Sequence, residues 1–181
     1  MSESFARRYG EADSFAIIVD RCDDAELACH VCFVIDGARY GDPSVCLYRS
    51  WCESYARHFL EMAPWRFRPE LSRLDADVVL GELFDVFFET DACDLSDLHL
   101  GTNARGEIVD LRDAFFFCEG LCELLIDDYD GVVFLTDEEK YRFLLRRAAD
   151  GSISDVCVPR DYVDEVMRAF RDGMTLSPRT S

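Results

Sequence analysis

Residues 27–35 constrain the fold of this chain more than any other segment. Their side chains alternate between two faces, and both faces are nearly apolar because His30 is the single strongly polar residue among them. This pattern is typical of a strand in the middle of a sheet. Asp36 and Gly37 follow, and this dipeptide favours a type I′ hairpin turn, in which both central residues have positive φ. We therefore expect a central strand and a return strand that begins at residues 38–40.

Alternation of apolar and polar side chains predicts further strands at residues 15–19, 132–135, 141–146 and 153–158. An acidic turn at residues 136–139 joins the second of these strands to the third. The chain is therefore expected to contain a second antiparallel hairpin near its carboxyl end.

Helical spacing of apolar residues predicts a helix that ends before Pro64. Asp42 and Pro43 suit its N-cap and first position, where an oxygen acceptor and a missing N–H are both favourable. A second helix is expected at residues 77–88, and a last helix with Asp161 as its N-cap.

The remaining segments give weaker signals. Residues 64–73 form a basic, aromatic connection, and residues 89–113 are acidic and irregular. Residues 114–126 are apolar on every side, so periodicity does not separate a strand from a buried helix. Residues 1–12 and 171–181 are expected to be flexible termini.

Together these elements predict a single domain, residues 1–181, of the α+β class. We expect a mainly antiparallel sheet of about five strands packed against two to four helices. No apolar run has the length of a signal peptide or a membrane span, so we expect a soluble, cytoplasmic protein. The nine cysteines are odd in number and irregularly spaced, which favours reduced, buried thiols.

Carboxylates outnumber cations heavily, and the formal net charge is −18. Residues 74–104 contain eight carboxylates and no Arg or Lys, and residues 113–139 contain nine more and again no cation. Such blocks are either solvated or face something positive. The basic residues between Arg57 and Arg73 resemble a nucleic-acid patch, but the overall charge repels a polyanion. We expect no nucleic-acid partner, and an intramolecular role for this basic segment opposite the acidic blocks.

Metal and catalytic sites are poorly supported by the sequence. Strand alternation places Cys29 on the opposite face from His30 and Cys32, so these three do not converge on one ion. The acidic residues 127–131 fail the calcium-loop pattern at its first and last ligands. The three histidines lie in no catalytic motif. We therefore expect no metal, no cofactor, no catalytic residue and no enzymatic activity.

Two stretches resemble a known family. Near the start of the chain, the family shows a strand pair joined by a turn, and then a helix. Here the turn motif is Ile35-Asp36-Gly37, and the motif before the helix is Tyr40-Gly41-Asp42. Residues 129–147 and 156–167 resemble the family's later strand pair and ending. The matching residues there are Asp130, Gly131, Phe134, Leu135, Asp137, Glu138, Pro159, Tyr162 and Val163. In these features, which cover the first and last thirds, the chain is similar to immunity protein family 42 of bacterial polymorphic toxin systems.

The resemblance implies a protein that binds a cognate toxin in the producing cell and blocks it without chemistry. Many toxins are nucleases that bind phosphates with cationic surfaces, so we expect a basic toxin domain facing an acidic surface. We expect no membrane partner, and a monomer or weak homodimer. The candidate partner-binding residues are Glu82, Asp85, Glu89, Asp91, Asp94, Asp97, Asp127, Asp128 and Asp130.

Two other functions remain open at this stage. An acidic secretion chaperone that escorts an effector is also small and α+β, although such chaperones usually open with a helix. A small cytoplasmic hydrolase of unknown type is the third candidate, because acid–base chemistry depends on geometry that a sequence does not show. The acidic surface also has a simpler explanation, since acidic surfaces aid solubility.

Overall fold

The computed structural model describes residues 7–22, 27–42, 44–84, 100–102, 108–110, 112–117, 129–136 and 139–175. Its larger sheet, sheet A, is antiparallel and runs in the order β1-β2-β3-β4, with β5 also paired to β3. The strands are β1 (Arg7–Gly10), β2 (Phe15–Arg21), β3 (Ala28–Ile35), β4 (Ala38–Tyr40) and β5 (Cys46–Tyr48).

The predicted central strand is confirmed. β3 pairs with β2 along one edge and with β4 and β5 along the other, and Val31, Phe33 and Ile35 are fully buried. The hairpin turn is also confirmed, because Asp36 has a φ of 49° and Gly37 a φ of 77°.

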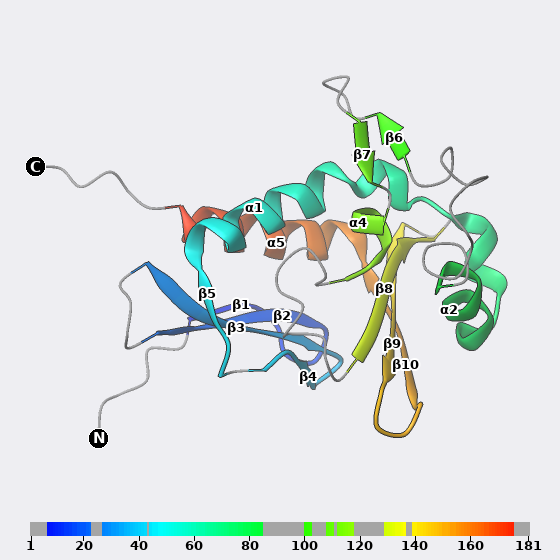
Figure 1. Ribbon diagram of the computed structural model, residues 1–181, viewed down its shortest axis with the longest axis horizontal. Helices are drawn as coiled ribbons and strands as arrows, with labels where there is room; N and C mark the ends of the chain where they lie inside the picture. Colours follow the sequence, from blue (N-terminus) through cyan, green and yellow to red (C-terminus); the bar gives the residue numbers. More distant parts are fainter. Residues whose placement is uncertain are drawn as a thin grey trace, which may run out of the picture.

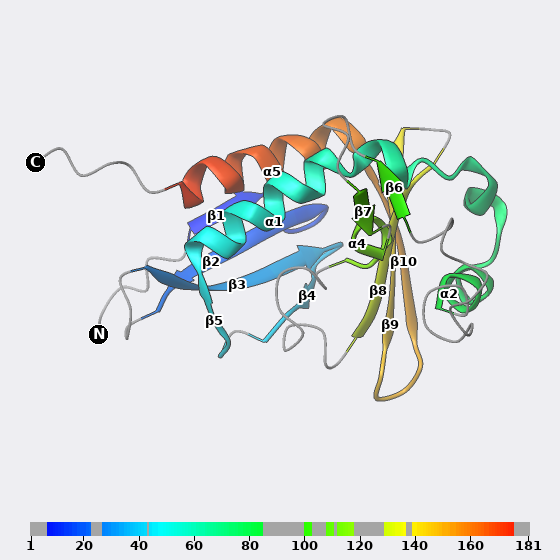
Figure 2. The ribbon, with the colours of Figure 1, turned by 45° about the horizontal axis from the view of Figure 1, so that its top comes forward.

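Two long helices cover one face of sheet A. Helix α1 (Arg49–Glu61) and helix α5 (Arg160–Met174) lie side by side above the strands (Figures 1 and 2). The predicted start of the first helix at Asp42 is wrong. A carboxylate oxygen of Asp42 accepts a hydrogen bond from the Ser44 N–H at 2.7 Å, and strand β5 follows before the helix begins. An aspartate can make this local turn as readily as a helix cap, so the signal was ambiguous.

The three-stranded sheet B has the order β10-β9-β8 and is antiparallel. It consists of β8 (Tyr129–Leu135), β9 (Lys140–Arg147) and β10 (Ile153–Pro159), which confirms the predicted later strands. Alternate side chains serve two cores. Phe143 joins the main core shared with sheet A, α1 and α5, while Leu144 joins a second core on the other face.

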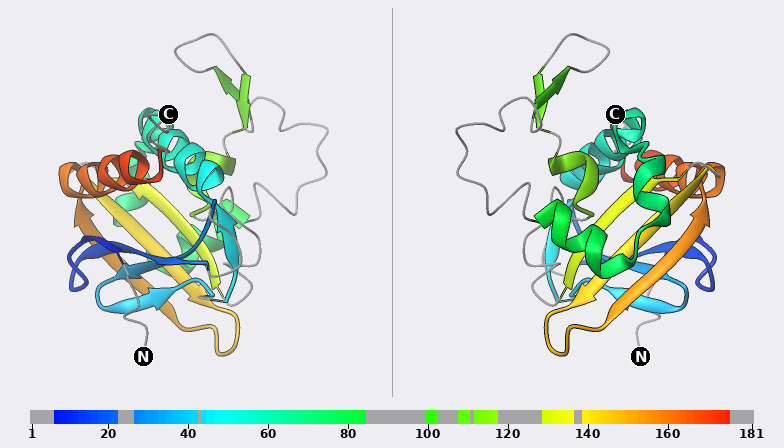
Figure 3. Two further views of the ribbon diagram at one scale, coloured as in Figure 1. Left: turned by 90° about the vertical axis from the view of Figure 1, so that its left-hand side faces the viewer. Right: turned by 90° about the vertical axis from the view of Figure 1, so that its right-hand side faces the viewer.

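The segment after α1 covers this second core. It forms the short 3₁₀ helices η1 (Ala63–Arg66) and η2 (Pro69–Arg73), then helix α2 (Ala76–Phe84). Figure 3 shows α2 lying across sheet B at the end of the molecule. Val79 and Leu80 are fully buried there, as the spacing predicted, whereas residues 85–88 of the predicted helix lie outside the described residues.

Part of the segment expected to be irregular is ordered. Strands β6 (Leu100–Thr102) and β7 (Ile108–Asp110) pair with each other, and helix α4 (Arg112–Phe115) follows. The apolar run that starts at Ala114 therefore begins as the end of a short buried helix. Its remainder, residues 118–126, lies outside the described residues.

The last helix differs slightly from expectation. Its N-cap position is Pro159, and Asp161 lies in the first turn, where a carboxylate favours the positive end of the helix dipole. The helix continues to Met174, whose side chain is buried. Within the described part of the chain, no helix is both long and apolar enough to cross a bilayer. The α+β class with antiparallel sheets is confirmed, and its strands are divided mainly between two sheets.

Two helical glycines provide a test of this packing. A Cβ added at Gly173 would lie 1.9 Å from the Tyr9 hydroxyl oxygen, whereas one added at Gly81 would meet nothing within 4 Å. We expect Gly81→Ala to raise the free energy of unfolding by about 0.5–1 kcal/mol through helix propensity. Gly173→Ala should instead lower it by about 1–3 kcal/mol because of overpacking. Urea denaturation measures both, and a stabilised Gly173→Ala variant would contradict the packing of β1 on α5.

Candidate partner-binding surface

Most of the predicted partner-binding residues lie outside the described part of the chain. Asp85, Glu89, Asp91, Asp94, Asp97, Asp127 and Asp128 are in this group. Glu82 belongs to helix α2, and Asp130 belongs to strand β8. The described residues therefore include only residues 74–84 and 100–102 of the first acidic block, and separate pieces of the second.

Asp130 has an ion-pair partner within its own chain. It lies directly opposite Arg146 in the β8–β9 register, and one carboxylate oxygen accepts hydrogen bonds from Arg146 Nε at 3.0 Å and Nη2 at 2.6 Å. The negative charge of Asp130 is therefore partly compensated in the unbound protein. Asp130 is a weaker candidate for partner binding than its place in an acidic sequence suggested.

The start of helix α2 combines exposed carboxylates with exposed apolar side chains. Asp75 and Asp77 are exposed, and so are Leu74 and Val78, which are 36% and 42% exposed. Leu74 lies just before the helix in an extended conformation, and Val78 lies in the first turn of the helix. We call these four residues the α2 surface. Apolar side chains bordered by charged groups are the usual composition of a protein-binding patch.

Arg142 attaches this surface to sheet B. Its guanidinium makes two hydrogen bonds to the Asp155 carboxylate, at 2.8 and 2.7 Å, which raise the pKa of Arg142. It also donates to the backbone carbonyls of Leu71 at 3.1 Å and Leu74 at 3.0 Å. The chain that leads into α2 is thus held by a largely buried arginine, so the α2 surface is a fixed feature of the fold.

The basic segment before α2 places an arginine in the core. Arg66 is fully buried, donates to the backbone carbonyls of Phe59 and Ala114, and stacks 3.9 Å from the centre of the Phe59 ring. Burial lowers its pKa. Its hydrogen bonds therefore serve the core and do not go to an acidic side chain, although Arg68 does approach Glu70 at 4.0 Å.

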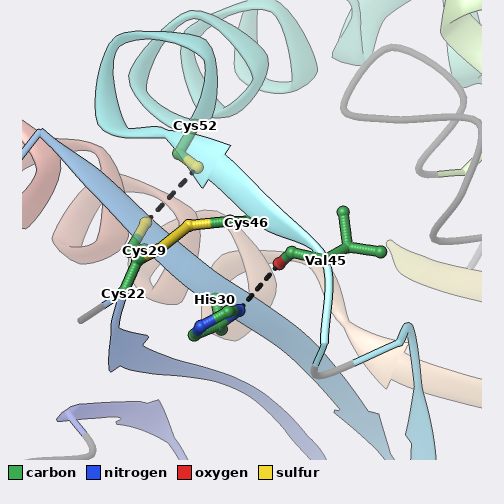
Figure 4. The surroundings of a disulfide bond; sticks show 6 residues. All are labelled: Cys22, Cys29, His30, Val45, Cys46 and Cys52. Atoms are coloured by element: carbon green, nitrogen blue, oxygen red, sulfur yellow. Dashed lines mark hydrogen bonds between the residues drawn. A yellow bond between two sulfur atoms is a disulfide. The ribbon is translucent and has the colours of Figure 1, made fainter. Parts of the chain in front are cut away.

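A corner of sheet A brings together several thiols. Cys22 and Cys46 form a disulfide, which contradicts the expectation that all cysteines are reduced (Figure 4). On the helix-facing side, Cys29 Sγ lies 3.9 Å from Cys52 Sγ. The hydrogen bond between these two thiols lowers the pKa of Cys29 and raises that of Cys52. Sequence spacing could not show that Cys22 and Cys46 meet, because Cys22 follows β2 and Cys46 begins β5, on either side of β3.

The same corner carries a second exposed apolar group. Leu27, Tyr48 and Trp51 are more than half exposed, and the Tyr48 and Trp51 rings contact each other edge to face with centroids 5.3 Å apart. Figure 1 places β5 and α2 at opposite ends of the molecule. This aromatic corner is therefore separate from the α2 surface.

An open groove of about 600 Å³ lies between η2 and sheet B. Arg73, Lys140, Arg142 and Asp155 supply its charged lining, together with Ser72, Thr136 and Cys157. Arg142 and Asp155 are already bound to each other there. The groove therefore holds a structural ion pair.

The role of Arg142 can be tested by removing its charge. Arg142→Met should lower the free energy of unfolding by about 2 kcal/mol, because several hydrogen bonds from a charged donor are lost together. Amide hydrogen exchange at residues 69–80 should also become faster. Arg147→Met is the matched control, since Arg147 is exposed and its ion pair with Asp150 is long, at 3.9 Å. Equal urea midpoints for the two variants would contradict the proposed attachment.

Comparison with known proteins supports the resemblance noted in the sequence. The family model described as immunity protein 42 matches residues 1–173. No curated protein and no solved structure matches the chain. The family match spans both of the stretches that carried the resemblance and the segment between them. The chain therefore belongs to the immunity protein 42 family.

Proposed function

We propose that this immunity protein neutralises its cognate toxin by binding a cationic, nuclease-like toxin domain through an acidic surface that begins at helix α2. The protein acts in the cytoplasm of the producing cell and blocks the toxin without catalysis. The observation that carries the proposal is the α2 surface, where exposed carboxylates flank exposed apolar side chains at the start of the first cation-free block.

Electrostatics explains why such a surface suits such a partner. A nuclease binds phosphates through cationic side chains, and carboxylates can occupy the same positions. Opposite charge also steers the two proteins together, which raises the association rate by about tenfold to a thousandfold. Rapid association matters for an inhibitor that must reach the toxin before the toxin reaches nucleic acid.

Apolar contact supplies the part of the binding energy that salt does not screen. Leu74 and Val78 offer such contact within the α2 surface. Because Arg142 fixes the backbone at Leu74, little ordering is needed when a partner binds. A preorganised surface therefore supports tight binding as well as fast association.

Ionic strength provides the first test. The cognate toxin domain should associate more slowly as salt increases, because the Debye length falls from about 30 Å at 0.01 M to about 3 Å at 1 M. Stopped-flow fluorescence measures the association rate constant, and we expect it to drop by at least about tenfold over this range. An association rate that does not change with salt would exclude electrostatic recognition.

Charge-neutral variants locate the surface. The double substitution Asp75→Asn with Asp77→Asn should reduce the association rate at low salt by about three- to tenfold. Asp161→Asn with Glu165→Gln is the matched control, since it removes the same charge from two exposed carboxylates at the start of α5. If the control slows association as much as the α2 variant, only net charge matters and the α2 surface is not the binding site.

A further inference from the structure

We propose that the reduced chain binds a zinc ion through the thiolates of Cys22 and Cys46 and the imidazole of His30. This site is independent of the proposed toxin-binding surface. The observation that points to it is that one ligand atom from each of the three side chains lies within 4.8 Å of the others.

Strand pairing brings these residues to one face of sheet A. Cys46 lies directly opposite His30 in the β3–β5 register, and paired residues point to the same side of a sheet. On the other edge of β3, Asp20 is opposite His30 and Arg21 is opposite Cys29, so Cys22 follows β2 on the side of His30. The disulfide therefore crosses over β3 beside His30, as Figure 4 shows.

Cys29 and Cys52 do not belong to this group. Strand alternation points Cys29 to the helix-facing side, where it meets Cys52 in the core. Cys29 and His30 therefore diverge, as strand alternation predicted, but His30 meets two cysteines that are distant in sequence. Cys22 follows β2 and Cys46 begins β5, which is why these two cysteines show no metal-binding spacing in the sequence.

The hydrogen bond of His30 prepares the ring for a cation. His30 Nδ1 lies 2.9 Å from the Val45 carbonyl oxygen, which can only accept, so Nδ1 carries the proton. In the neutral ring Nε2 is then unprotonated and can act as a ligand. Histidines that bind zinc usually donate their other N–H to a carbonyl or carboxylate in this way.

Zinc fits this set of donors better than calcium or magnesium, because thiolates and imidazole are its usual ligands. With zinc–sulfur bonds of about 2.3 Å in a tetrahedron, the two sulfurs would separate to about 3.8 Å once their bond is broken. A water molecule completes the fourth position. The site is accessible, since Cys46 is exposed and Cys22 and His30 are half-buried. The Asp20 carboxylate on the same face adds a favourable charge.

The disulfide and the ion exclude each other. Two equivalents of a small-molecule thiol reduce the Cys22–Cys46 bond, which takes up two electrons and two protons, and the small thiol is oxidised to its own disulfide. Binding of zinc then releases both thiol protons to solvent. The cytoplasm keeps thiols reduced, so the zinc-binding state is the one expected at the proposed place of action.

The test uses the full chain reduced with a phosphine and titrated with Co²⁺, a spectroscopic substitute for zinc. We expect one equivalent to give the visible d–d bands of a tetrahedral ion and thiolate charge-transfer absorption, both abolished by Zn²⁺. The oxidised chain should give neither. Cys22→Ser, Cys46→Ser and His30→Gln should each weaken zinc binding by at least about tenfold, while Cys157→Ser, at an exposed cysteine of β10, should leave it unchanged.

Cysteine protection gives a second readout that does not depend on variants. Zinc should slow alkylation of Cys22 and Cys46 in the reduced chain, with peptide mass spectrometry identifying the protected positions, and should leave Cys157 as reactive as before. The proposal is wrong if the reduced chain binds no zinc, if His30→Gln binds as tightly as the parent, or if the protected cysteines are others.

Discussion

Contact between aromatic rings from two sheets is the interaction on which the rest of this structure depends. The Phe117 ring packs between Phe33 of sheet A and Phe143 of sheet B, with centroids 4.8 and 5.2 Å away. Phe15 stacks on Phe143 at 5.5 Å and closes the group. Aromatic side chains bury more area than any others, so this group supplies much of the energy that joins the sheets. Helices α1 and α5 then cover sheet A, and α2 covers the outer face of sheet B.

The strands were predictable where alternation alone decides the structure. β9 has apolar residues on both faces because it separates two buried cores. β3 has them because it lies in the middle of its sheet. The positive φ at Asp36 and Gly37 followed from local chemistry. The helix start predicted at Asp42 was wrong because an aspartate side chain caps a turn as well as a helix. The start of the apolar run at Ala114 could not be assigned, since its burial on all sides depends on α2 and sheet B.

The candidate site was less predictable than the fold, because it depends on contacts between distant residues. Sequence located the carboxylates but not the arginine that neutralises Asp130, since that pair requires the β8–β9 register. The charge of Arg66 suggested a surface, yet its backbone partners place it in the core. Cys22, His30 and Cys46 meet only because β3 is paired on both edges. In each case contacts formed by the fold, and no local pattern, determine what the side chain does.

Membership in the immunity protein 42 family and the α2 surface lead to one account, in which a rigid acidic surface docks on a cationic toxin. Amide hydrogen exchange of the chain, alone and bound to its toxin, tests this account most directly. The account predicts that protection on binding is strongest at residues 74–84. Protection confined to the aromatic corner around Tyr48 and Trp51, with α2 unchanged, would contradict it.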